Sequence, residues 1–65
     1  MITKIEIEFT DGQKIDFNRD NLTDLAVDTE SDFFVVILKT NKVRHIWYPT
    51  HTIKYVAFDE YKDNR

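Results

Sequence analysis

The sequence predicts an all-β fold built from five antiparallel strands, and three observations carry that prediction. Apolar and charged residues alternate strictly near the start of the chain. β-Branched and aromatic residues dominate residues 33–58, and short runs of turn-forming residues separate the apolar segments. Both patterns are typical of strands. Because the chain has 65 residues, we expect one domain that spans residues 1–65.

The first two expected strands, residues 4–9 and 14–17, form a hairpin. In residues 4–9 every second side chain is apolar, so one face of the strand suits a core and the other suits water. Between the strands, Asp11 precedes Gly12, which adopts the positive φ angle of a tight turn without steric cost. The second strand then returns antiparallel to the first.

Residues 18–32 are polar, acidic and weakly patterned, which predicts a long acidic loop. Two local structures fit inside this loop. Leu22, Leu25 and Ala26 would share one face of a single helical turn, whereas a short strand fits residues 25–28 equally well. The sequence does not choose between them.

The three remaining strands are expected at residues 33–39, 43–48 and 53–58. The strand at 33–39 is apolar on both faces, which places it at the centre of a barrel or in a dimer contact. Pro49 ends the next strand because proline has no backbone N–H to donate, and residues 50–52 are long enough for a one-turn link. The charged residues 59–65 are expected to form a frayed tail.

The charge of the chain is divided along its length. Residues 1–32 hold nine acidic and three basic residues, whereas residues 33–58 hold four basic residues and no acidic one. The second segment also contains both histidines and the single tryptophan. Such a division predicts a surface that faces a particular partner. The residues expected to contact it are Lys39, Lys42, Arg44, His45, Trp47, Tyr48, His51, Lys54 and Tyr55.

Two kinds of partner fit this segment. Aromatic residues and arginine are enriched at the centres of protein interfaces, which favours a binding module, or an accessory or inhibitory protein, that acts on another protein. The apolar run from Phe33 to Leu38 exceeds what a small core needs, so a homodimer through this run is a further hypothesis. The alternative partner is a single-stranded nucleic acid, whose phosphates and bases would contact the basic and aromatic residues of segment 39–55.

Metal binding and catalysis have little support in the sequence. Acids at alternate positions in residues 28–32 imitate the start of a calcium-binding loop, but Phe33 stands where that loop needs glycine. His45 and His51 lack a third ligand at the spacing of a zinc site, and Ser31 has no glycine-rich turn around it. We therefore expect no metal, no cofactor and no enzymatic activity.

The composition also bears on location. The chain has no cysteine, which fits a reducing compartment, and Met1 leads into the chain without the apolar core of a signal peptide. No stretch approaches the roughly 20 apolar residues that span a bilayer. We expect a cytoplasmic protein with no membrane partner, of the kind that bacteria or their phages use as small accessory proteins.

The order of the expected elements resembles that of an SH3-like small barrel. A hairpin, a long second connection, another hairpin and a one-turn link precede the last strand. Trp-Tyr-Pro at residues 47–49, followed by Tyr55-Val56, is similar to the proline, turn and aromatic-valine ending of SH3 domains. The acidic loop, residues 20–32, takes the place of theirs. This resemblance implies a five-stranded antiparallel barrel.

A second resemblance is to Sm-like barrels. Their first motif pairs an alternating strand ending in Asp-Gly with a later Asn-Leu and Asp. Residues 5–12, Asn21-Leu22 and Asp24 are similar to that motif. Because both resemblances rest on residue types common in small barrels, they imply a fold and carry little information on function.

Overall fold

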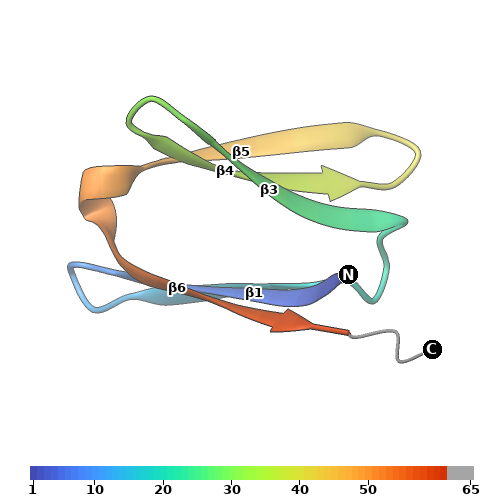
Figure 1. Ribbon diagram of the computed structural model, residues 1–65, viewed down its shortest axis with the longest axis horizontal. Helices are drawn as coiled ribbons and strands as arrows, with labels where there is room; N and C mark the ends of the chain where they lie inside the picture. Colours follow the sequence, from blue (N-terminus) through green and yellow to red (C-terminus); the bar gives the residue numbers. More distant parts are fainter. Residues whose placement is uncertain (62–65) are drawn as a thin grey trace.

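The structure, a computed structural model that describes residues 1–61, is a sandwich of two antiparallel three-stranded sheets (Figure 1). Its elements are β1 (Ile2–Phe9), β2 (Lys14–Asn18), β3 (Asp24–Glu30), β4 (Phe33–Lys39), β5 (Val43–Pro49), the 3₁₀ turn η1 (Thr50–Thr52) and β6 (Ile53–Glu60). The first sheet has the strand order β2–β1–β6 and the second has the order β3–β4–β5. The all-β prediction is confirmed, and within residues 1–61 no ladder closes the two sheets into a barrel.

Strand β1 is the centre of the first sheet. It pairs with β2 through the predicted hairpin, in which Gly12 has a φ of 91° and donates its N–H to the Phe9 carbonyl at 3.0 Å. On its other side β1 pairs with β6, which continues to Glu60 and so includes the first two residues of the expected tail. The Tyr61 N–H donates to the Met1 carbonyl at 2.8 Å, and residues 62–65 lie outside the described residues.

The expected acidic loop contains a strand, so residues 1–61 form six strands where five were predicted. Residues 24–30 form β3 and pair with β4 along their whole length, which shows the strand at 25–28 and rules out the helical turn. Leu25 and Val27 pack toward the core, so apolar residues do alternate in this segment. The acidic residues on its other face are what made the segment resemble a loop. Residues 19–23 are what remains of the connection.

Arg19 fastens this connection to both sheets. Its guanidinium donates to the Ile2 carbonyl at 3.3 Å, to the Thr23 carbonyl at 3.2 Å and to Asp24 Oδ1 at 3.0 Å. The hydrogen bond from Arg19, with one from the Leu25 N–H, holds the pKa of the Asp24 carboxyl below its ordinary value. The start of β3 is therefore tied to β1 across the open end of the sandwich.

The core lies between the inner faces of the two sheets. It is formed by Ile5, Ile7, Leu25, Phe34 and Val36. Two aromatic pairs join the sheets across it: the Phe9 and Tyr48 rings lie 5.4 Å apart, and the Phe34 and Phe58 rings lie 6.5 Å apart. Such tilted arrangements suit the ring quadrupoles and add to the apolar contact. One layer of side chains therefore serves both sheets.

The pairing of β1 with β2 supplies a matched test of this core. Ile7 has no exposed surface, whereas Ile15, its cross-strand partner, is 37% exposed at the edge of the sheet. We expect Ile7→Val to lower the free energy of unfolding by about 0.5–1.5 kcal/mol, because the cavity left by the lost methylene stays unfilled. Ile15→Val should cost clearly less. Urea unfolding followed by circular dichroism measures both, and equal losses would contradict the placement of the core.

Candidate functional site

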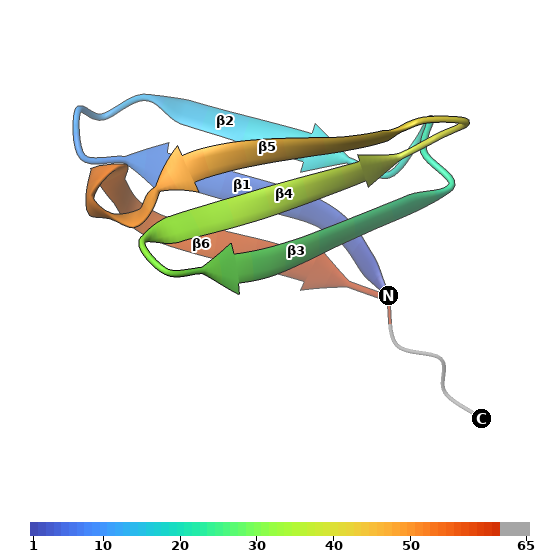
Figure 2. The same cartoon turned by 90° about the horizontal axis from the view of Figure 1, so that it is seen from above.

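The outer face of the second sheet, which Figure 2 views from above, is apolar over two of its three strands. Because side chains alternate along a strand, the residues between the core positions of β4 and β5 point outward. We call the outward apolar residues of this sheet the apolar face; they are Ala26, Phe33, Val35, Ile37, Val43, Trp47 and Pro49. The outward positions of β4 and β5 also hold two basic residues, Lys39 and His45.

Val35 and Trp47 form the middle of the apolar face. They are cross-strand partners, and Val35 is only 2% exposed although it points away from the core. The Trp47 ring packs edge-on against the Phe33 ring with a centroid distance of 5.6 Å. Trp47 itself is 46% exposed and Val43, further along β5, is 60% exposed. The face is thus an ordered cluster with large apolar groups still open to water.

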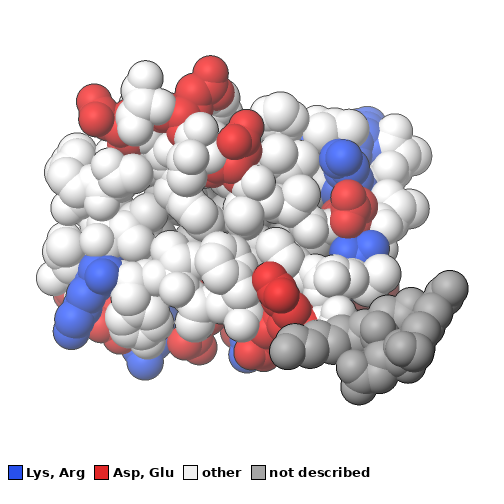
Figure 3. Space-filling view, in the orientation of Figure 1, with Lys and Arg blue, Asp and Glu red and all other residues white. Residues whose placement is uncertain are grey.

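An acidic border runs along one side of the apolar face. Asp28 and Glu30 point outward from β3, and Asp32 follows in the β3–β4 turn; all three are exposed. None of them belongs to an ion pair among residues 1–61. Figure 3 shows acidic atoms over the β3–β4 hairpin at the upper left, with no lysine or arginine beside them. We call these three residues the acidic border.

The outer face of the first sheet has the opposite character. Lys4 pairs with Asp16 at 3.7 Å, and Glu8 accepts from both Lys14 at 3.5 Å and Lys54 at 3.2 Å. The Lys54 hydrogen bond is the main cause that lowers the pKa of the Glu8 carboxyl from its ordinary value. Acidic and basic atoms accordingly mix along the lower edge of Figure 3. This face is solvated and largely neutralised.

The structure distributes the predicted contact residues over five places. His45 and Trp47 lie on the outer face of the second sheet, with Lys39 at its end in an ion pair with Asp24 at 3.8 Å. Lys54 and Tyr55 lie on the opposite outer face, that of the first sheet. Lys42 and Arg44 border a hollow of about 270 Å³ beside the β4–β5 turn. Tyr48 packs inward and His51 sits in η1.

The basic and aromatic residues of segment 39–55 therefore do not share one surface. The structure brings two further sets of residues together with Trp47: the outward residues of β4, above all Phe33 and Val35, and the acidic border. The sequence predicts an interface at the first set only as a dimer contact through residues 33–38, and it does not point to the second set. The signal was present in the sequence, because a strand that is apolar on both faces must cover its second face with neighbours from the adjoining strand.

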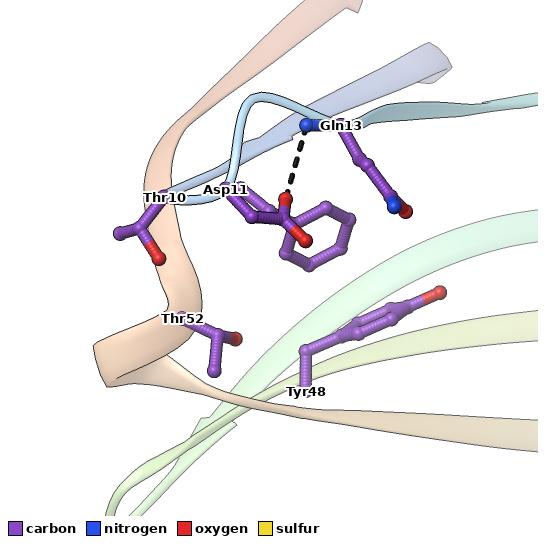
Figure 4. A pocket seen from close by; sticks show the side chains of 6 residues that line it. Thr10, Asp11, Gln13, Tyr48 and Thr52 are labelled. Atoms are coloured by element: carbon purple, nitrogen blue, oxygen red, sulfur yellow. Dashed lines mark hydrogen bonds between the residues drawn. The ribbon is translucent and has the colours of Figure 1, made fainter.

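A recess opens at the end of the sandwich near η1 (Figure 4). It has a volume of about 300 Å³ and is lined by Phe9, Thr10, Asp11, Gln13, Tyr48 and Thr52. Burial raises the pKa of the Tyr48 phenol, which stays neutral at physiological pH. A wider hollow of about 430 Å³ lies over β1 and β2, but charged side chains line most of it. The recess is distinguished from it by its aromatic walls.

Glu8, on the outer face of the first sheet, makes a pH-dependent contribution to the free energy of unfolding. Because its pKa is lowered in the folded state, this contribution is present above the unfolded pKa of about 4.3 and is lost as pH falls through the folded value. We expect Glu8→Gln to be less stable than the wild type at neutral pH, and the difference to close in acid. Urea midpoints at about pH 7 and about pH 3 measure it.

Glu6→Gln is the matched control for this prediction. Glu6 points outward from the same strand and belongs to no ion pair among residues 1–61. If Glu6→Gln shows the same loss with the same pH dependence, the contribution does not come from the lysines that hold Glu8.

The described residues hold no cluster of side chains suited to a metal ion. Across residues 1–61, no group of three or more His, Cys, Asp and Glu side chains is arranged to hold a metal ion. Within the same part of the chain, no helix has the length and apolar character needed to cross a membrane. No protein-family model, curated protein or solved structure matches the chain. Function is therefore inferred from the geometry of the surfaces.

Proposed function

We propose that this chain is a non-enzymatic binding module that docks a protein segment rich in apolar and basic side chains onto the apolar face. The observation that carries the proposal is the contrast between the two outer faces. One is covered with ion pairs, whereas the other exposes Phe33, Val43 and Trp47 and carries the acidic border along β3. Exposed clusters of large apolar residues rimmed by polar ones mark interaction sites.

The make-up of the apolar face suits a protein interface. Tryptophan is among the residues that contribute most to binding energy, especially where it is packed against neighbours. The Trp47 ring packs against Phe33 and lies beside its cross-strand partner Val35, which reduces the side-chain freedom that would be lost on binding. Val35 is already excluded from water at the centre of this cluster. A partner would bury the remaining exposed apolar residues of a surface that is already formed.

Charge complementarity favours a basic partner. Asp24 on the same sheet is balanced by Arg19 and Lys39, but the acidic border is not balanced by any cation of residues 1–61. Asp28 Oδ1 accepts the adjacent Thr29 N–H at 2.8 Å. Lysine or arginine beside the apolar residues of a partner would neutralise this border and orient the complex.

A second copy of the chain fits the same face less well. Two copies stacked by a two-fold axis in the interface would set β3 against either β3 or β5 of the other copy. On this face β3 presents acids, and β5 presents His45 as its only titratable residue. Since the whole chain has a formal charge of −3, a homodimer through residues 33–38 would leave the acidic border unbalanced.

Nucleic acid binding receives less support from the geometry than protein binding does. A strand-binding groove needs several cations and rings along one surface. Lys39 and Lys54 are each engaged in an ion pair, and they lie on opposite outer faces. Arg44 lies at the end of the sandwich beside the β4–β5 turn.

The fold that carries this face is proposed to be an SH3-like barrel opened at its second strand. Strands β2 and β3 together occupy the chain position of one long strand that bends from the first sheet into the second. The support is the order of connections: a hairpin, two further hairpins around β4, the η1 link, and a last strand that returns to β1. Residues 19–23, held by Arg19, interrupt the bend.

Selection of peptides tests the proposed partner. A library of random peptides displayed on phage is selected on the immobilised protein, and an enriched peptide is synthesised for calorimetry. We expect enriched peptides to combine Lys or Arg with apolar residues. Trp47→Ala should weaken binding by about 30-fold or more, as loss of a central interface residue does. Asp28→Asn combined with Glu30→Gln should weaken binding and reduce its salt dependence.

Tyr55→Ala is the matched control, because Tyr55 is an aromatic residue of similar exposure, 39%, on the opposite outer face. Its affinity should equal that of the wild type. Undiminished binding by Trp47→Ala, or enriched peptides without basic residues, would overturn the proposal. So would a free protein that sediments at twice 7.8 kDa and becomes monomeric on Trp47→Ala, since the occupant would then be a second copy.

A further inference from the structure

We infer that the recess between the β1–β2 turn and η1 is a binding site for an alkylguanidinium group, the charged end of an arginine side chain. This site is separate from the apolar face, and the inference does not depend on the proposed function. It rests on three features of the recess: fixed walls, an aromatic surface, and a carboxylate that no cation of residues 1–61 neutralises.

Hydrogen bonds hold both walls of the recess in place. On one side, the Phe9 N–H donates to the Gln13 carbonyl at 2.8 Å and the Gln13 N–H donates to Asp11 Oδ1 at 3.0 Å. On the other side, the Thr52 hydroxyl donates to the Pro49 carbonyl at 2.7 Å. The Thr10 N–H joins the two walls by donating to the Thr52 carbonyl at 2.8 Å. The recess is therefore preorganised, which lowers the entropic cost of filling it.

The aromatic part of the recess comes from Phe9 and Tyr48, whose rings pack together at 5.4 Å with an angle of 52° between their planes. The Tyr48 phenol is neutral at physiological pH, and burial raises its pKa further. A neutral ring attracts a cation placed over its face, and the planar guanidinium of arginine also stacks on such a face. The aromatic pair thus offers the recess a surface suited to a flat cation.

Asp11 supplies the charge. One of its carboxylate oxygens accepts the Gln13 N–H, and Figure 4 shows the other oxygen directed toward the space above Tyr48 and Thr52. None of the lysines and arginines among residues 1–61 lines the recess. The Thr52 hydroxyl, whose hydrogen is used by the Pro49 carbonyl, keeps its lone pairs as acceptors. A guanidinium has five N–H donors and no acceptor, so the free Asp11 oxygen and the Thr52 hydroxyl can both accept from it.

The size of the recess agrees with a single side chain. Its volume of about 300 Å³ is at the lower limit of ordinary ligand pockets, roughly 300–1,000 Å³. A metal ion is not favoured, because Asp11 is the one carboxylate lining it. An anion would meet that carboxylate. Among simple ligands, a flat organic cation can contact both the aromatic rings and the Asp11 carboxylate.

Titration with blocked arginine tests the inference. Acetyl-arginine methylamide is added to ¹⁵N-labelled protein, and amide shifts are followed by NMR. We expect saturable shifts at Thr10, Gln13 and Thr52, with a dissociation constant on the order of millimolar, as a lone exposed side chain gives. Acetyl-citrulline methylamide, which has the same shape without the charge, should bind at least about fivefold more weakly.

Matched variants separate the charge from the fold. Asp11→Asn keeps the oxygen that accepts the Gln13 N–H, so the turn is retained while the charge is lost, and affinity should fall about fivefold. Asp20→Asn, a substitution in the β2–β3 connection, should leave affinity unchanged. Tyr48→Phe keeps the ring face and should still bind, whereas Tyr48→Leu should not.

The two sources of a guanidinium are distinguished by comparing methylguanidinium with the blocked arginine. Tighter binding of the blocked arginine would identify a peptide side chain as the ligand, and equal binding would identify the charged group alone; both support the inference. Equal binding of the citrulline compound would overturn it. Shifts spread over surface acids without preference for the recess, or undiminished binding by Asp11→Asn, would also overturn it.

Discussion

The constraint on which this structure depends is that 65 residues supply one core layer for two sheets. Each sheet buries its inner face against the other, and each therefore has an outer face that nothing in residues 1–61 covers. The central strand of each sheet decides what that face becomes. Strand β1 alternates strictly, so its outer residues Lys4, Glu6 and Glu8 are charged. Strand β4 does not alternate, so its outer residues are apolar and must be sheltered by Trp47 and its neighbours.

How far the fold could be predicted follows from how strongly each strand alternates. The hairpin at β1 and β2, the pairing of β4 with β5 and the one-turn link at η1 were all predicted, because periodicity and turn chemistry agree there. Strand β3 was left open between a helical turn and a strand. Its acids at Asp24, Asp28 and Glu30 are poor strand formers, and pairing along the whole of β4 overrides that local preference.

The candidate site was less predictable, because residues that lie together in the sequence are placed on different faces when the chain folds into two sheets. Segment 33–58 looks like one basic and aromatic patch, yet successive residues of a strand point to opposite faces. The last strand then leaves the second sheet and returns to β1, which carries Lys54 and Tyr55 to the far side of the molecule. The acids that border the apolar face come from the other segment altogether, through the pairing of β3 with β4.

Adjacent residues of β5 serve the two proposed surfaces. Trp47 points outward onto the apolar face, and Tyr48 points inward to the recess. The two surfaces also share one end of the sandwich, since the Asp32 carbonyl accepts both the Thr50 N–H at 2.7 Å and the Thr50 hydroxyl at 3.1 Å, which fixes the acidic border to η1. Both surfaces present acids that no cation of residues 1–61 pairs, whereas Glu8, on the central strand of the opposite face, is held by two lysines. A basic partner would therefore approach this end of the molecule, because ion pairs already neutralise most of the charge on the other outer face.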